Sequence, residues 1–206
     1  NQTTDTEKCA VMFSEIEIPS VVLLESIRDI FPDDGDEITG IYDDQDGILI
    51  FKQRSICKIY TNGSPDNWRL VKLYTNLGCD EANSLAKYGN DYVFSFQDRI
   101  YSWNSGSGLK EIGLEIRDTL KTVSAYHCAA ISTRWVLIGV TATGITGGYG
   151  FLIYDKIIGS WYRFSTTTVP YVVLIKEHGT NAGKIITSNA TYLLYYNESA
   201  TVDSNT

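Results

Sequence analysis

The chain is poor in clustered positive charge and in long apolar runs, and each shortage excludes a class of function. Its 206 residues carry a formal net charge of −8, and the pI is near 4.7. Broad binding to a nucleic-acid backbone needs clustered lysines and arginines, so we expect no sequence-specific nucleic-acid partner. No stretch reaches about 18 consecutive apolar residues, the length that spans a bilayer, and residues 1–8 show no signal-peptide pattern.

Cysteine and histidine are also sparse, which argues against a metal centre or another cofactor. The four cysteines lie far apart, with no C-x-x-C pair: Cys9, Cys57, Cys79 and Cys128. This spacing is a poor match to zinc sites, and we expect free, buried thiols. Adjacent residues of a strand point to opposite faces, so His127 and Cys128 are not expected to act as a base and a nucleophile. His178, the second histidine, precedes a glycine and is expected in a turn.

Three segments share one pattern, in which an apolar run leads through a tight polar turn to an aromatic-rich return. They span residues 48–60, 91–103 and 150–164. The first two turns are expected at Gln53–Arg54 and at Asp98–Arg99. Tyr, Trp, Ile, Val and Thr fit a pleated, half-buried surface. The pattern therefore predicts repeated antiparallel hairpins and an all-β fold.

One segment departs from this pattern and predicts a helix. Ile112, Ile116 and Leu120 follow one another at intervals of four residues, while most charged residues of the segment lie elsewhere. Apolar residues at this spacing form one face of a helix. We expect an amphipathic helix over 109–123, packed against the edge of a sheet.

The strand units recur at roughly 40 to 50 residues, a period typical of propeller blades with four strands each. We therefore expect a β-propeller-like array of four-stranded antiparallel blades in a single domain over 1–206, and a β-sandwich of the same strands is the alternative. The start without Met and the polar end indicate a segment of a longer chain.

Several short motifs follow one another in a fixed order over residues 10 to 165. They are Ser14 with Pro19, Ile38–Ile41, Ile48–Lys52, Ser55–Tyr60, Gly78–Cys79 with Ser84, Phe94–Asp98, Ile100–Tyr101, the segment 109–123, Tyr154–Asp155 and Trp161–Phe164. In this order they resemble the β-propeller region of bacteriophage tail and neck virion proteins, including tail-nozzle-type proteins of short-tailed phages.

The resemblance implies a structural role without catalytic residues. It implies a rigid module that is assembled in the host cytoplasm, resides in the tail or neck of the virion, and packs against other copies of itself and neighbouring virion proteins. Tyrosines and tryptophans at loop ends would supply anchor contacts.

An acidic turn is the main candidate for metal binding. Asp43, Asp44 and Asp46 precede Gly47, and calcium loops of the EF-hand type place oxygen ligands and a glycine at similar intervals. The match is incomplete, because Tyr42 and Gln53 fall where that loop carries carboxylates. An acidic hairpin turn is the alternative that we prefer, and we expect no metal.

The aromatic residues offer a second function, the binding of a receptor or of a glycan on a host surface. A sugar can stack on the flat apolar face of an aromatic ring, and the tryptophan candidates are Trp68, Trp103, Trp135 and Trp161. Trp68, Trp103 and Tyr149 are the candidates for contact with a partner. A glycosidase would need two carboxylates about 5 to 9.5 Å apart and is the least supported function.

The glycine-rich segment 144–150 lacks the lysine of a phosphate-binding loop and is expected to be a hairpin tip.

Overall fold

The computed structural model describes residues 8–14, 26–176, 183–188 and 193–196. The chain divides into two compact units, Asn1–Asp80 and Glu81–Thr206. The single domain expected over 1–206 stays a prediction. In the described part of the chain, no helix combines the length and the apolar character needed to cross a membrane.

The first unit contains a four-stranded antiparallel sheet and a two-stranded one. The larger sheet has the order β3-β4-β5-β6, so that each strand pairs with the next along the chain, and β1 pairs with β2. The elements are β1 (Ala10–Met12), β2 (Ile27–Asp29), the 3-10 helix η3 (Pro32–Asp34), β3 (Ile38–Asp44), β4 (Gly47–Lys52), β5 (Ser55–Tyr60), the 3-10 helix η4 (Pro65–Asn67) and β6 (Arg69–Thr75).

The core of the first unit follows from the alternation of side chains along β4 and β5. Ile50 lies opposite Cys57, and Ile48 lies opposite Ile59, so these four side chains share one face of the sheet. Together with Ile30, at the end of β2, they form one apolar cluster. This packing holds the β1–β2 pair and the residues that follow β2 against the sheet.

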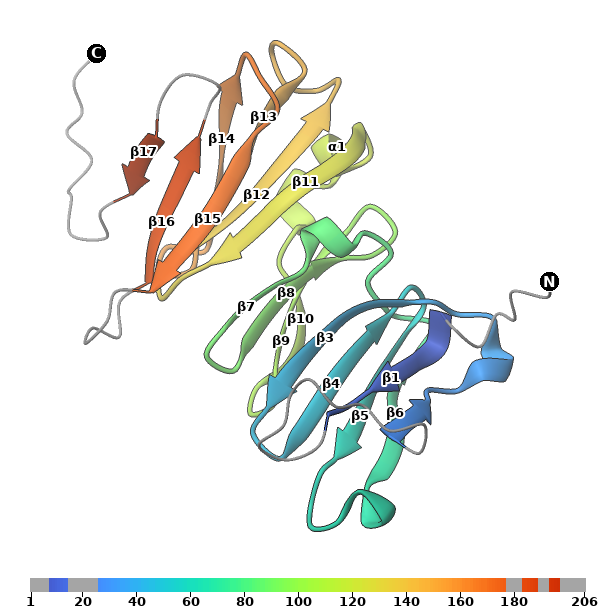
Figure 1. Cartoon of the computed structure of the whole chain (residues 1–206). Coiled ribbons are helices and arrows are strands. Elements are labelled where there is room, and N and C mark those ends of the chain that lie inside the picture. The colour runs from blue at the N-terminus through green and yellow to red at the C-terminus, as the bar shows by residue number, and fades with distance from the viewer. Residues whose placement is uncertain (1–7, 15–25, 177–182, 189–192, 197–206) are drawn as a thin grey trace. The chain divides into compact units, whose positions relative to one another are not determined.

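The second unit contains two four-stranded sheets and one three-stranded sheet, all antiparallel and all with strands in chain order. Figure 1 shows the four strands side by side in the sheet β11–β14. The elements are η5 (Ala82–Ser84), β7 (Ala86–Tyr88), β8 (Asp91–Ser95), β9 (Ile100–Asn104), β10 (Gly108–Glu111), η6 (Leu114–Ile116), α1 (Arg117–Leu120), β11 (Val123–Ile131), β12 (Trp135–Ala142), β13 (Tyr149–Asp155), β14 (Ser160–Thr166), β15 (Tyr171–Lys176), β16 (Gly183–Ser188) and β17 (Leu193–Tyr196).

One apolar cluster joins the two four-stranded sheets of this unit. Val136 and Ile138 point to the same face of β12 and belong to a cluster that also contains Val93 of β8 and Ile100 of β9. All four side chains are at most 1% exposed. The second unit therefore has a continuous core between the sheets β7–β10 and β11–β14.

The expected all-β fold with four-stranded antiparallel sheets is confirmed, including the three hairpins. The second turn lies one residue earlier than expected. Its central residues are Gln97 and Asp98, which both have positive φ, of 48° and 57°, and Phe96 and Arg99 exchange backbone hydrogen bonds around them. Two-residue hairpin turns of this geometry match the twist of the strands. No closed propeller is detected among the described strands, which form three four-stranded sheets, one three-stranded sheet and one two-stranded sheet.

The helix expected over 109–123 is wrong in type and in length. Its first residues form strand β10, in which Leu109 pairs with Trp103, and only residues 114–120 are helical, as a 3-10 turn and a single α-helical turn. The predicted apolar residues are nevertheless buried, since Ile112 and Ile116 are 8% exposed and Leu120 is fully buried. Pairing with the neighbouring strand thus outweighs the local helical pattern.

Candidate functional site

Two carboxylates of the acidic turn between β3 and β4 pair with a lysine of β5. The ammonium of Lys58 lies 2.7 Å from Oδ2 of Asp44 and also pairs with Oδ1 of Asp46, while Asp43 is exposed. Burial lowers the pKa of Lys58, but its hydrogen bonds to Asp44 and Asp46 outweigh this effect and raise the pKa. Among the described residues, no group of three or more His, Cys, Asp and Glu side chains is placed to hold a metal.

The aromatic candidates are used mainly for packing. Trp103 is buried with its ring centroid 5.2 Å from that of Tyr92, and half-buried Trp68 contacts the ring of Phe13 at 5.0 Å. Tyr149 opens β13 and is half-buried. Trp68 belongs to the first unit, whereas Trp103 and Tyr149 belong to the second.

The two remaining tryptophans also have structural partners. Trp135 lies beneath the guanidinium of Arg134, which is 4.4 Å from the ring centroid. The indole N–H of Trp161 donates to the carbonyl oxygen of Ile112 at 2.6 Å. Their rings therefore contribute to the packing of the second unit.

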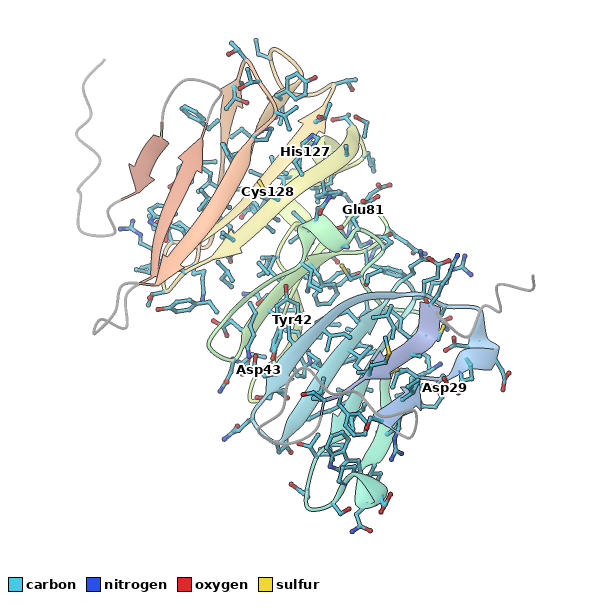
Figure 2. The ribbon with its side chains drawn as sticks, viewed as in Figure 1. Asp29, Tyr42, Asp43, Glu81, His127 and Cys128 are labelled. Carbon is cyan, nitrogen blue, oxygen red and sulfur yellow. The ribbon has the colours of Figure 1, made fainter. Side chains whose placement is uncertain are left out.

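His127 and Cys128 each have a partner of their own. Nε2 of His127 lies 2.6 Å from Oγ1 of Thr141, and the thiol of Cys128 contacts the carbonyl oxygen of Pro170 at 3.3 Å. Figure 2 labels both residues on β11. His178 lies outside the described residues.

Beside η3 lies an ion-pair network that the sequence does not predict. The ammonium of Lys52 is fully buried and donates to the carbonyl oxygens of Ile30 and Phe31, at 2.9 and 3.2 Å, and to Oδ1 of Asp34 at 2.6 Å. Lys72 of β6 pairs with Oδ2 of Asp34 at 2.7 Å. Burial raises the pKa of Asp34, but hydrogen bonds from the two lysines and from the backbone outweigh it, and the pKa is lowered.

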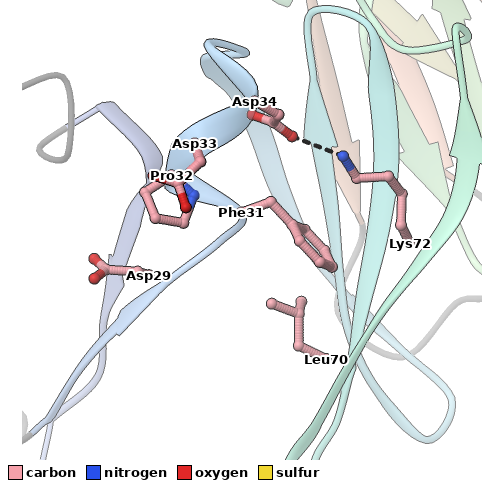
Figure 3. A pocket seen from close by; sticks show the side chains of 7 residues that line it. All are labelled: Asp29, Phe31, Pro32, Asp33, Asp34, Leu70 and Lys72. Carbon is pink, nitrogen blue, oxygen red and sulfur yellow. Dashed lines mark hydrogen bonds and ion pairs between the residues drawn. The ribbon is translucent and has the colours of Figure 1, made fainter.

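This network forms one wall of an open hollow of about 460 Å³ in the first unit, which we call the Phe31 hollow (Figure 3). Its lining residues are Asp29, Phe31, Pro32, Asp33, Asp34, Leu70 and Lys72. The Lys72 ammonium lies 4.6 Å from the centroid of the Phe31 ring. The carboxylates of Asp29 and Asp33 are exposed, and no partner within the described residues neutralises them. The hollow thus combines an apolar floor with two available negative charges.

The second unit exposes apolar side chains along its strand β14, at the edge of the sheet β11–β14. The exposed fractions are 75% for Ile157 and 60% for Ile158, in the β13–β14 turn, and 48% for Tyr162 and 45% for Phe164, in β14. Tyr162 and Phe164 lie two residues apart and therefore share one face of the strand. Arg163 lies between them and points to the opposite face by the same alternation. We call these four residues and Arg163 the β14 edge.

The turn that carries the two isoleucines is held rigidly by Asp155. Oδ1 of this buried carboxylate accepts hydrogen bonds from the N–H groups of Ile157 and Ile158, at 2.9 and 3.3 Å. Gly159, with φ of 77°, closes the turn by donating its N–H to the carbonyl oxygen of Asp155 at 2.7 Å. Such a positive φ favours glycine. The isoleucines are therefore presented to solvent in a fixed position.

Charge is divided unevenly between the two units. Residues 1–80 contain 15 Asp and Glu against 7 Lys and Arg, whereas residues 81–206 contain 10 of each. The whole formal net charge of −8 thus lies in the first unit. Within residues 156–176, which include β14, there is no Asp or Glu, while Lys156, Arg163 and Lys176 are positive.

The sequence reading missed both the Phe31 hollow and the β14 edge. The hollow joins the segment around η3 to Leu70 and Lys72 of β6, about forty residues later, so that no local pattern marks it. The β14 edge does have a local signal, because a pair of isoleucines stands in a turn, where polar residues dominate.

No protein-family model and no curated protein matches this chain. Among solved structures, the chain is similar to a chain in a complex of an S. cerevisiae Dbp5 variant bound to Nup159, a Gle1 variant, IP6 and ADP. The two are 12% identical with a TM-score of 0.49, and the match covers 80% of this chain and 50% of that chain. The chain thus spans about half the length of the solved chain, and a likeness at this level says nothing about function.

Proposed function

We propose that this chain is a non-catalytic structural module of a bacteriophage tail or neck complex, which docks against neighbouring subunits in the virion. The phage setting rests on the ordered motifs between residues 10 and 165. The docking role rests on the structure of the β14 edge. Consecutive antiparallel sheets around well-packed cores supply the rigidity that such a module needs.

The single observation that carries the docking role is the exposure of apolar side chains on β14 and on the turn before it, in the described part of the chain. Natural proteins cover an edge strand, shorten it or give it charged side chains, because an exposed flat edge pairs with other chains. The edge strand β10 has four residues, including Lys110 and Glu111, and the edge strand β6 carries Arg69 and Lys72. β14 has seven residues, one charge and two exposed aromatic rings. A surface of this kind marks an interaction site.

The ionisable groups with shifted pKa values also support a structural role. Burial raises the pKa of Asp91, but its hydrogen bonds with Lys156 and Asn104 outweigh this effect and lower the pKa. Asp34 and Asp155 are held in the same way by basic side chains. Shifted pKa values can mark catalytic groups as well as structural ion pairs, and for these three carboxylates an ion pair that fastens one element to another contributes to the lowered pKa.

The glycan-binding alternative has less support than docking. The rings of Trp68 and Trp103 pack against Phe13 and Tyr92, so that packing uses the surfaces on which a sugar would stack. The exposed rings of Tyr162 and Phe164 stand beside isoleucines, a combination typical of protein interfaces.

The test of the proposed function is to locate the chain in phage particles made from the genome that encodes it. Mass spectrometry of purified virions should detect its peptides, and antibody labelling followed by electron microscopy should place it at the tail or neck. Virions that contain none of its peptides would refute the proposal, as would labelling confined to the capsid shell.

A further inference from the structure

Resting on the proposed function, we infer that copies of this chain bind one another head to tail, with the β14 edge of one copy docked on the Phe31 hollow of the next. The two surfaces lie in different units of the chain, β14 in the second and the hollow in the first. A contact between two different surfaces is heterologous, so that each bound copy keeps one surface free for a further copy.

The first argument is the fit of apolar groups. The floor of the hollow is made by Phe31, Pro32 and Leu70, and the β14 edge presents Ile157 and Ile158 on a turn that Asp155 holds in place. The hollow of about 460 Å³ is open to solvent, so side chains on a protruding turn can enter it without any rearrangement. Since the turn is already ordered, binding loses little conformational freedom, which favours affinity.

The second argument is the complementarity of charge. Asp29 and Asp33 stand exposed at the hollow, and Arg163 is the one charged residue of β14. Arg163 is exposed and makes a single side-chain hydrogen bond, from Nη1 to Oγ1 of Thr119 at 3.2 Å, so other guanidinium N–H groups can reach a partner's carboxylates. Opposite charges on facing surfaces steer association and fix its register.

The same charges explain why the partner surface is the hollow and not a second β14 edge. Two β14 edges would bring two arginines together, and two hollows would bring together the acidic residues of two first units. Like charges that face each other in an interface disfavour the complex. Only the pairing of edge with hollow places positive charge against negative charge, and one chain carries both surfaces.

Sedimentation velocity of the full chain tests this contact, with two variants that each block one surface. Asp29→Lys with Asp33→Lys blocks the hollow, and Ile157→Ser with Ile158→Ser blocks the edge without adding a negative charge that the new lysines could attract. The wild type should form oligomers that dissociate as the salt concentration rises, and each variant alone should be a monomer. A mixture of the two should form a 1:1 dimer and no larger species, because one intact edge and one intact hollow remain.

Matched controls place the same charge changes on an exposed part of the second unit. Asp118 and Lys121 have side chains that are 98% and 59% exposed, and Asp118→Lys and Lys121→Gln should leave self-association unchanged. The milder changes Asp33→Asn and Arg163→Gln guard against misfolding, and each should weaken association roughly tenfold. Circular dichroism checks that every variant keeps its strands.

Two results would overturn the inference. Folded hollow-blocked protein that still associates like the wild type would show that the hollow is not the partner of the edge. A wild type that remains monomeric at every concentration would remove the contact altogether. Detection of the chain in virions decides the proposed function separately, so that either idea can fail while the other stands.

Discussion

The guanidinium of Arg134 donates two hydrogen bonds to one oxygen of the buried Asp155 carboxylate, from Nε at 3.0 Å and from Nη2 at 2.7 Å. The other oxygen of Asp155 is used by the backbone of the β13–β14 turn. One carboxylate thus joins the β11–β12 turn, which carries Arg134, to the turn that exposes Ile157 and Ile158.

This arrangement predicts different effects for two substitutions of Asp155. Asp155→Asn keeps an oxygen for the turn but removes the charge that pairs with Arg134, and we expect it to lower the free energy of unfolding by about 2 kcal/mol. Asp155→Ala removes both functions and should cost more. Urea unfolding measures both, and hydrogen exchange of the Ile157 and Ile158 amides should speed up in Asp155→Ala and far less in Asp155→Asn. Equal exchange in the two variants would contradict the role given to the carboxylate.

The same carboxylate predicts a loss of stability in acid. Burial raises the pKa of Asp155, but the hydrogen bonds from Arg134 and the turn outweigh it, so the pKa in the folded state is below the ordinary value of 3.8. A lowered pKa contributes stability above the ordinary value, and that contribution is lost as the pH falls through the folded-state pKa. The stability difference between the wild type and Asp155→Asn should therefore shrink as the pH falls below about 4. A constant difference in urea titrations down to pH 2 would refute this.

The buried Lys52 predicts a strong local effect in the first unit. Lys52→Met leaves the carbonyl oxygen of Ile30 without its donor and Asp34 without one of its partners, and we expect a loss of about 2 to 4 kcal/mol. Lys72→Met removes a partly exposed partner of the same carboxylate and should cost less than about 1 kcal/mol. Hydrogen exchange of the peptides that contain β2 and η3 measures both changes. Equal protection in the two variants would contradict the ranking.

A side chain at position 78, just after β6, should clash with the backbone of the first unit. A Cβ atom at this position would overlap the carbonyl oxygen of Lys52 and lie 2.6 Å from the backbone nitrogen of Arg54. Backbone atoms cannot rotate away as a side chain does, so Gly78→Ala should destabilise the first unit by about 1 to 3 kcal/mol. Gly106→Ala, which meets only a side-chain oxygen at 3.3 Å, is the matched substitution and should be nearly neutral. Thermal unfolding compares the two.

Much of the fold could be predicted from the sequence because hairpins are local. The apolar run around Ile50, the turn at Gln53–Arg54 and the return through Cys57 lie within a few residues of one another, and the structure pairs them as expected. The helix predicted over 109–123 is wrong because the structure of its first residues depends on strand pairing with β9, in which Leu109 pairs with Trp103. Burial of Ile112 and Leu120 was predictable, since an apolar stripe is buried whether or not its backbone is a regular helix.

The candidate surfaces were harder to predict. The acidic turn is recognisable in the sequence, but the partner of Asp44 and Asp46 is Lys58 on the next strand but one, and residue spacing alone does not reveal this pairing. The flat apolar rings of Trp68 and Trp103 suit a contact surface, yet such rings also serve the core. The exposure of Tyr162 and Phe164 follows from the position of β14 at the end of a sheet, which only the strand order establishes.

The enclosure of Lys52 has a chemical consequence. An amine that is closed off from water and hydrogen-bonded on three sides cannot be acylated while the fold is intact, whereas the exposed amines of Lys8, Lys110 and Lys121 are open to the reagent. Its rate of acetylation, followed by mass spectrometry, therefore reports how often the first unit opens.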